Sequence, residues 1–227
     1  MDQGGASLHI FKGKTIKNKV FGKQIIGIAG THKGAGVTHL GLMLTTCLSE
    51  GLGLNTAYLH WTDNKDVCFL RNHFCPEDKN DSFGEKFQVS RAVFYPRVRR
   101  EKMFDILSEG YDCIVMDFGS SYKDHREEFL RCDKKIIVSC LSPWKRFYLE
   151  EFIAETEEIP ESANWIYGIN HSSAKEVSDA VRRLKRKASD GRTLLGKILT
   201  IPYEKDPFFL SPDAMNFTKY LLNNLRT

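Results

Sequence analysis

The chain has 227 residues, of which 41% are hydrophobic and 27% charged, a balance typical of a single globular domain. The net charge of +4 is too small to indicate a nucleic-acid partner by itself. No apolar run approaches the ~18 residues that a membrane helix needs, and the polar start of the chain lacks the apolar core of a signal peptide. We therefore expect a cytoplasmic protein.

The predicted elements alternate along the chain. Residues 1–19 are rich in glycine, lysine and polar residues, so we expect a flexible tail, with a candidate edge strand at residues 8–11, before one domain over residues 20–227. Short apolar runs predict strands at 24–29, 56–60, 113–116, 135–140, 165–169 and 198–201. Helical spacing predicts helices at 37–49, 101–109, 123–131, 144–158, 174–187 and 213–225. Residues 87–95 resemble strand material, and the polar stretch 63–84 predicts a long loop. The alternation predicts an α/β fold of the P-loop NTPase type, a mostly parallel sheet with helices on both faces.

The glycine-rich stretch between the first strand and the first helix is the most informative part of the chain. Its candidate binding residues are Gly30, Thr31, His32, Lys33, Gly34, Ala35, Gly36, Val37, Thr38 and His39. A helix start offers free N–H groups and a positive dipole end, and glycines let the backbone approach an anion closely. The stretch therefore predicts a phosphate-binding loop. A plain glycine turn between strand and helix is the alternative.

The loop departs from the usual pattern G-x-x-x-x-G-K-[ST] at two positions. With Gly36 and Thr38 aligned, Val37 replaces the lysine and Thr31 replaces the first glycine. That lysine normally places an ammonium against the β- and γ-phosphates. Losing a charged hydrogen bond costs about 1.5–3 kcal/mol. We expect nucleotide binding through the backbone, and at most weak ATPase activity.

The chain resembles the MinD/ParA family of deviant P-loop ATPases from about residue 24 to its C-terminus. Their loop reads K-G-G-x-G-K-[ST], and here His32 takes the early lysine position. The strand ending at Asp117 is similar to the family's Walker B strand, whose acid holds the water shell of a magnesium ion; a plain strand-ending aspartate is the alternative. Asn170 resembles the asparagine that contacts adenine in relatives, and Pro202 lies in a segment similar to the one that closes over the base.

A second ATPase element is also altered. In the family, the second strand ends in D-x-D, and the second aspartate helps to activate the attacking water. The matching residues here are His60, Trp61 and Thr62. His60 and Trp61 could stack on a ligand or cap the core. Lys33 or His32 could replace the missing lysine, in this subunit or in a partner.

The resemblance implies ATP or ADP and Mg²⁺ as ligands, with Thr38 and Asp117 as the metal residues. It also implies a protein partner and a nucleotide-dependent homodimer. The favoured function is a nucleotide-binding regulatory or localisation protein with weak or absent hydrolysis. Two alternatives stay open: a nucleotide-independent scaffold, or an active small-molecule P-loop kinase or ligase.

Three other features allow a structural and a functional interpretation. Basic residues are dense at 182–187 and 97–100, which weakly indicates non-specific DNA binding, although a solvated surface explains them equally. The last helix predicts packing against the domain, because Lys219 and Arg226 are its only cations and a membrane anchor needs basic flanks. Cys68 and Cys75 flank His73, but their spacing fits no zinc pattern, so we expect structural thiols.

Overall fold

The computed structural model describes residues 22–76, 86–187 and 196–223, with the side chains of residues 185–187 left aside. The expected tail at residues 1–19 and its candidate strand lie outside these residues. None of the helices in the described ranges is long and apolar enough to cross a membrane.

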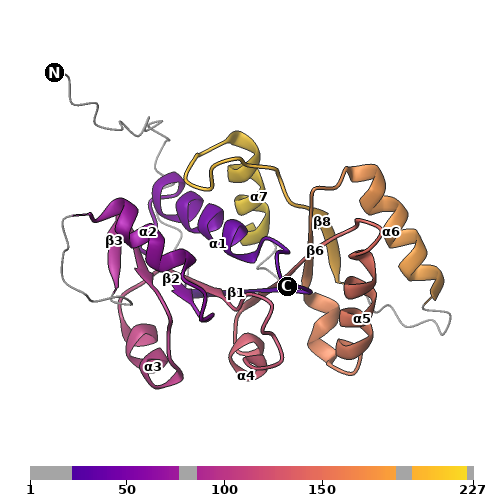
Figure 1. Ribbon diagram of the computed structural model, residues 1–227, viewed down its shortest axis with the longest axis horizontal. Coiled ribbons are helices and arrows are strands. Elements are labelled where there is room, and N and C mark those ends of the chain that lie inside the picture. Colours follow the sequence, from indigo (N-terminus) through magenta and orange to yellow (C-terminus); the bar gives the residue numbers. More distant parts are fainter. Residues whose placement is uncertain (1–21, 77–85, 188–195, 224–227) are drawn as a thin grey trace.

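The core of the molecule is one eight-stranded sheet in the order β3-β4-β2-β5-β1-β6-β7-β8 (Figure 1). Neighbouring strands are parallel except for the antiparallel pair β3 and β4. The strands are β1 (Gln24–Gly30), β2 (Thr56–His60), β3 (Phe87–Val89), β4 (Ala92–Tyr95), β5 (Cys113–Asp117), β6 (Lys134–Cys140), β7 (Ile166–Asn170) and β8 (Lys197–Thr200). The predicted α/β fold with a mostly parallel sheet is confirmed.

Helices cover both faces of the sheet, as the sequence predicted (Figure 1). One face carries α1 (Val37–Thr46), α2 (Asp66–Phe74) and α7 (Pro212–Asn223). The other carries α3 (Arg100–Ser108), α4 (Arg126–Leu130), α5 (Arg146–Thr156) and α6 (Ala174–Lys187). Two short elements complete the described chain: the π-helix η1 (Cys47–Gly51) and the 3₁₀-helix η2 (Pro160–Asn164).

The continuous apolar runs form these strands because the sheet is buried on both faces. In β1, Ile26 and Ile28 belong to the core under α1, while Ala29 belongs to the core under α3, α4 and α5. Side chains alternate across a strand, so a run with no polar positions fits a sheet that has no solvated face.

Of two sequence predictions about local structure, the loop at 63–84 needs correction, and the strand material at 87–95 is confirmed. The stretch 63–84 is not a loop throughout, because α2 forms at residues 66–74. The helix buries little apart from Val67, Cys68 and Arg71, so its apolar spacing is too sparse to stand out in the sequence. Residues 87–95 form a tight hairpin, β3 and β4, with Ser90 at a positive φ of 52° in its turn.

The C-terminal helix packs on the domain, as predicted. Ala214, Phe217 and Leu221 of α7 are buried in the same core as α1. The predicted thiols are free, and Cys47, Cys68, Cys113 and Cys132 are buried. No group of three potential metal ligands of the kinds His, Cys, Asp and Glu occurs within the described ranges.

Gly27 of β1 lies in a closely packed part of the core, which a substitution can test. A Cβ added there would lie 2.7 Å from Cys132 Sγ and 3.1 Å from Cys132 Cβ. We expect Gly27→Ala to lower the free energy of unfolding by about 1–3 kcal/mol, the usual cost of overpacking. Urea denaturation measures the change. Gly110→Ala is the matched control, because a Cβ there meets nothing within 4 Å; equal stability of the two variants would contradict the tight packing.

Candidate functional site

The glycine-rich loop lies at the carboxyl edge of the sheet, between the end of β1 and the start of α1. Gly34 and Gly36 have φ values of 80° and 99°, in the left-handed region that favours glycine. Gly36 is the N-cap of α1, and no side chain caps this helix start. The loop therefore has the strand–loop–helix geometry that the sequence predicted.

Most backbone N–H groups of this loop have no hydrogen-bond acceptor among the residues that the structure describes. Thr31 N–H donates to Val138 O at 3.0 Å, and Ala35 N–H donates to His32 O at 3.2 Å. Within the described residues, nothing accepts a hydrogen bond from the N–H groups of Lys33, Gly34, Gly36, Val37 and Thr38. These donors and the positive end of the helix dipole make a site suited to an anion.

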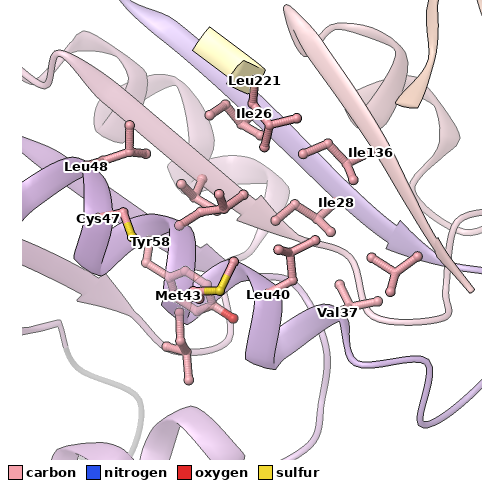
Figure 2. Close-up of a cluster of buried hydrophobic side chains, with 14 of the residues drawn as sticks. Ile26, Ile28, Val37, Leu40, Met43, Cys47, Leu48, Tyr58, Ile136 and Leu221 are labelled. Carbon is pink, nitrogen blue, oxygen red and sulfur yellow. The ribbon is translucent and has the colours of Figure 1, made fainter. Parts of the chain in front are cut away.

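Val37, which stands in the lysine position, points into the protein. Its side chain is only 5% exposed and packs in the core cluster with Ile28 and Leu40 (Figure 2). The same packing requires glycine at position 30, where an added Cβ would lie 2.8 Å from Val37 Cγ2. Val37 therefore closes the inner side of the loop and supplies no charge to its outer side.

His32 does not replace the missing cation. Its ring is buried and stacks on Tyr148 with centroids 5.3 Å apart, and its Nδ1 lies 2.9 Å from Thr31 Oγ1. Desolvation, assisted by the nearby Lys145, lowers the pKa of His32, so the ring is neutral at physiological pH. Lys33 is exposed at the outer side of the loop.

Asp117 and Thr38 are brought together, as predicted for a metal-binding pair. Thr38 Oγ1 donates to Asp117 Oδ2 at 2.7 Å, and Gly119 N–H donates to Asp117 Oδ1 at 2.8 Å. A third donor, which sequence reasoning missed, is the hydroxyl of Tyr58, 2.6 Å from Asp117 Oδ2. A tyrosine in the middle of a short predicted strand was the available signal, because a buried phenol usually finds a hydrogen-bond partner.

His60 lies beside this carboxylate at the end of β2. The register pairs His60 with Asp117, and His60 Nε2 is 3.9 Å from Asp117 Oδ2 and 2.7 Å from Thr62 Oγ1. Burial lowers the pKa of His60, and the attraction of Asp117 only partly opposes that effect. The contact is therefore between a neutral imidazole and a carboxylate. Trp61, in contrast, turns to the opposite core and stacks on Phe118.

Asn170 and Pro202 follow the neighbouring strands β7 and β8 at the same edge. The side-chain amide of Asn170 donates to Ala35 O at 2.6 Å and lies against Gly36, where it leaves no room for a Cβ. Asn170 thus holds the phosphate loop from the side. Pro202 is partly buried, and Tyr203 after it is 74% exposed.

A cavity of about 410 Å³ opens beside the loop on the α4 and α5 side of the sheet. Gly30 and Thr31 reach it from the loop, and it carries Asp124, Glu151 and Glu155 against Lys123. Lys123 is already paired with Glu155 at 2.9 Å. This excess of carboxylates disfavours phosphate in the cavity, so the glycine loop stays the candidate anion site.

Comparison with known proteins identifies the fold. No protein-family model and no curated protein sequence matches the chain. Among solved structures, it is similar to a plasmid partition protein from Borrelia burgdorferi B31 bound to AMPPNP, at 15% identity and a TM-score of 0.64, over 89% of this chain and 98% of that one. It is also similar to the MinD cell division protein of Aquifex aeolicus, at 19% identity and a TM-score of 0.55, over 87% of this chain and 86% of that one.

A third similar structure is an enzyme, cobyrinic acid a,c-diamide synthase from Mycobacterium smegmatis with bound ADP and magnesium. The identity is 12% and the TM-score 0.58, over 90% of this chain and 96% of that one. The class defined by the sheet and the glycine loop is thus the P-loop NTPase fold. Within that class, the chain has the fold of the MinD/ParA ATPases.

The buried His60 predicts a pH dependence of stability. Its pKa in the folded protein lies below the ordinary value of 6.5, so the unfolded chain takes up a proton first as the pH falls. The contribution of the neutral His60 to the free energy of unfolding is therefore present above about pH 6.5 and is lost as the pH falls below it. We expect the urea midpoint of the wild type to fall more between about pH 7.5 and 5.5 than that of His60→Gln. Parallel pH profiles of the two proteins would show that His60 does not carry this effect.

Proposed function

We propose that the protein is a nucleotide-binding regulatory or localisation protein of the MinD/ParA type, which binds ATP or ADP and hydrolyses ATP weakly or not at all. One observation carries the proposal: the loop keeps its free N–H groups at a helix start, while Val37 is buried where the lysine would stand. The backbone part of a phosphate site is present, and its charged side chain is missing.

Binding is supported by the donors that the loop offers. Backbone N–H groups and a helix dipole attract phosphate without any cationic side chain. Of the similar structures, the Borrelia partition protein holds AMPPNP and the Mycobacterium synthase holds ADP and magnesium. These ligands support nucleotide as the class of anion.

Weak hydrolysis follows from the charges near the loop. Phosphoryl transfer depends on electrostatic stabilisation of the charge that develops on the phosphate oxygens. Val37 offers none, and the neutral His32 is held under Tyr148. The uncharged side chain at position 37 also disfavours the alternative of a kinase or ligase, although Lys33 stays exposed at the outer side of the loop.

A protein partner is supported by aromatic side chains near the loop. Trp144 and Phe147, at the start of α5, are 73% and 51% exposed, next to the Tyr148 that covers His32. Aromatic residues are enriched where proteins bind each other. The six free cysteines suit the reducing cytoplasm as the place of this role.

The observations on the basic residues favour the surface interpretation over DNA binding. Arg182 pairs with Asp179, and Arg100 pairs with Glu128 at 2.5 Å. Arg97 Nη2 donates to Asp63 O at 3.2 Å. A cation that is already paired gains less from a phosphate backbone, so we do not include DNA in the proposed function.

Calorimetric titration of the purified protein with ATP and with ADP tests the binding. We expect saturable binding of both nucleotides, accompanied by a rise in melting temperature, because a ligand that binds only the folded state stabilises it. Phosphate release should stay near background. Absence of binding would favour the nucleotide-independent scaffold, and brisk ATP turnover would contradict the weak-ATPase proposal.

Replacing Val37 tests whether the missing lysine limits the affinity for ATP. We expect Val37→Lys to bind ATP roughly ten- to a hundred-fold more tightly than Val37→Met, the gain that one charged hydrogen bond provides. Methionine is the matched control because it brings length without charge to the same packed position. Equal affinities of the two variants, measured by the same titration, would show that the lysine position does not limit binding.

A further inference from the structure

The carboxylate of Asp117, under the glycine loop, already accepts three hydrogen bonds. Asp117 Oδ2 accepts from Tyr58 at 2.6 Å and from Thr38 at 2.7 Å, and Oδ1 accepts from Gly119 N–H at 2.8 Å. An ionised carboxylate has about four acceptor positions, so three of them are in use. Both positions of the oxygen that faces Thr38 are taken.

The surroundings of Asp117 do not suit a divalent cation. Its side chain is fully buried, and so is that of His60, whose Nε2 lies 3.9 Å away. Magnesium takes oxygen ligands in octahedral geometry and keeps several waters. The phenol and the peptide N–H direct hydrogen atoms at Asp117, and an imidazole stands where the family's D-x-D begins. No cluster of three potential metal ligands exists in the described ranges.

Tyr58 is held firmly in this position. Tyr58 is completely buried in the core beside α1 (Figure 2). A Cβ at Gly41 of α1 would lie 2.8 Å from its ring, and Phe94 packs against it at a centroid distance of 5.6 Å. Its hydroxyl donates to Asp117 Oδ2 from this packed position. A cation that needed Asp117 would have to displace this hydrogen bond from a packed core.

We infer that the loop binds nucleotide phosphates without a divalent cation, because Tyr58 and His60 occupy the surroundings that a magnesium shell would need. This inference rests on the proposed function. Backbone N–H groups and the helix dipole then provide the positive charge that the metal supplies elsewhere. The site selects the free nucleotide, and Mg²⁺ in solution competes with the protein for its phosphates.

Titration with a fluorescent ADP analogue, in EDTA and in millimolar MgCl₂, tests the inference on the wild-type protein. We expect affinity in EDTA to equal or exceed that in MgCl₂. Binding that is about tenfold tighter in MgCl₂, the value of one charge-assisted contact, would overturn the inference and leave the proposed function intact. Absence of binding in both buffers would overturn both.

Tyr58→Phe tests whether the Tyr58 hydroxyl keeps the divalent cation away from Asp117. The variant keeps the ring and frees one acceptor position of Asp117, so MgCl₂ should now strengthen nucleotide binding relative to EDTA. Tyr167→Phe is the matched control, because Tyr167 is equally buried but lies in the opposite core; it should respond to MgCl₂ as the wild type does. An unchanged MgCl₂ response in folded Tyr58→Phe would exclude Tyr58 as the cause.

A second variant tests cation binding by melting temperature, without nucleotide. His60→Asp places a second carboxylate beside Asp117, so MgCl₂ should raise its melting temperature and leave that of the wild type unchanged. Stabilisation of the wild-type protein by MgCl₂ alone, to the same extent as His60→Asp, would show that the native site already accepts the cation.

Discussion

The carboxyl edge of the sheet is organised around one buried carboxylate, which needs hydrogen-bond donors. Asp117 ends the central strand β5, between β1 and β2, and has no exposure to solvent. A buried charge is costly unless hydrogen bonds compensate it. Thr38 of the first helix and Tyr58 of the neighbouring strand provide that compensation, so the carboxylate joins the helix start to the sheet. The position of the phosphate loop follows from this connection.

P-loop proteins usually combine two sources of positive charge for phosphate, the backbone N–H groups of the loop and its side chains. At this edge of the sheet the two sources differ. The backbone source, free N–H groups at a helix start, is kept. The side-chain source is altered: Val37 is buried in the core, His32 is neutral beneath Tyr148, and the exposed Lys33 lies one place after the early lysine position. Such a site can hold a phosphate at rest, but it offers little to the extra charge of a transition state. This division is the physical reason for the proposal of a regulatory or localisation protein with weak or absent hydrolysis.

Most of the fold could be predicted from the sequence, because continuous apolar runs fit only strands that are buried on both faces. The error lies where that signal is weak, since helix α2 was missed because few of its residues are buried. Residues 87–95 were predicted as strand material, and only their pairing as a hairpin, which depends on a turn at Ser90, was left open. The place of the glycine loop and of Asp117 was predicted because strand ends of a parallel sheet meet at one edge; that the loop binds phosphate stays a prediction.

The sequence by itself determined the order of elements, the place of the glycine loop and the valine in place of lysine at position 37, since these depend on residue type and local spacing. Only the tertiary structure decided which way His32 turns, that Asn170 holds Ala35, and that Tyr58 reaches Asp117 from 59 residues away. The physical reason is that a side chain's partner depends on strand register and helix packing. Those long-range contacts settle whether a polar group serves a ligand or the protein's own buried charge.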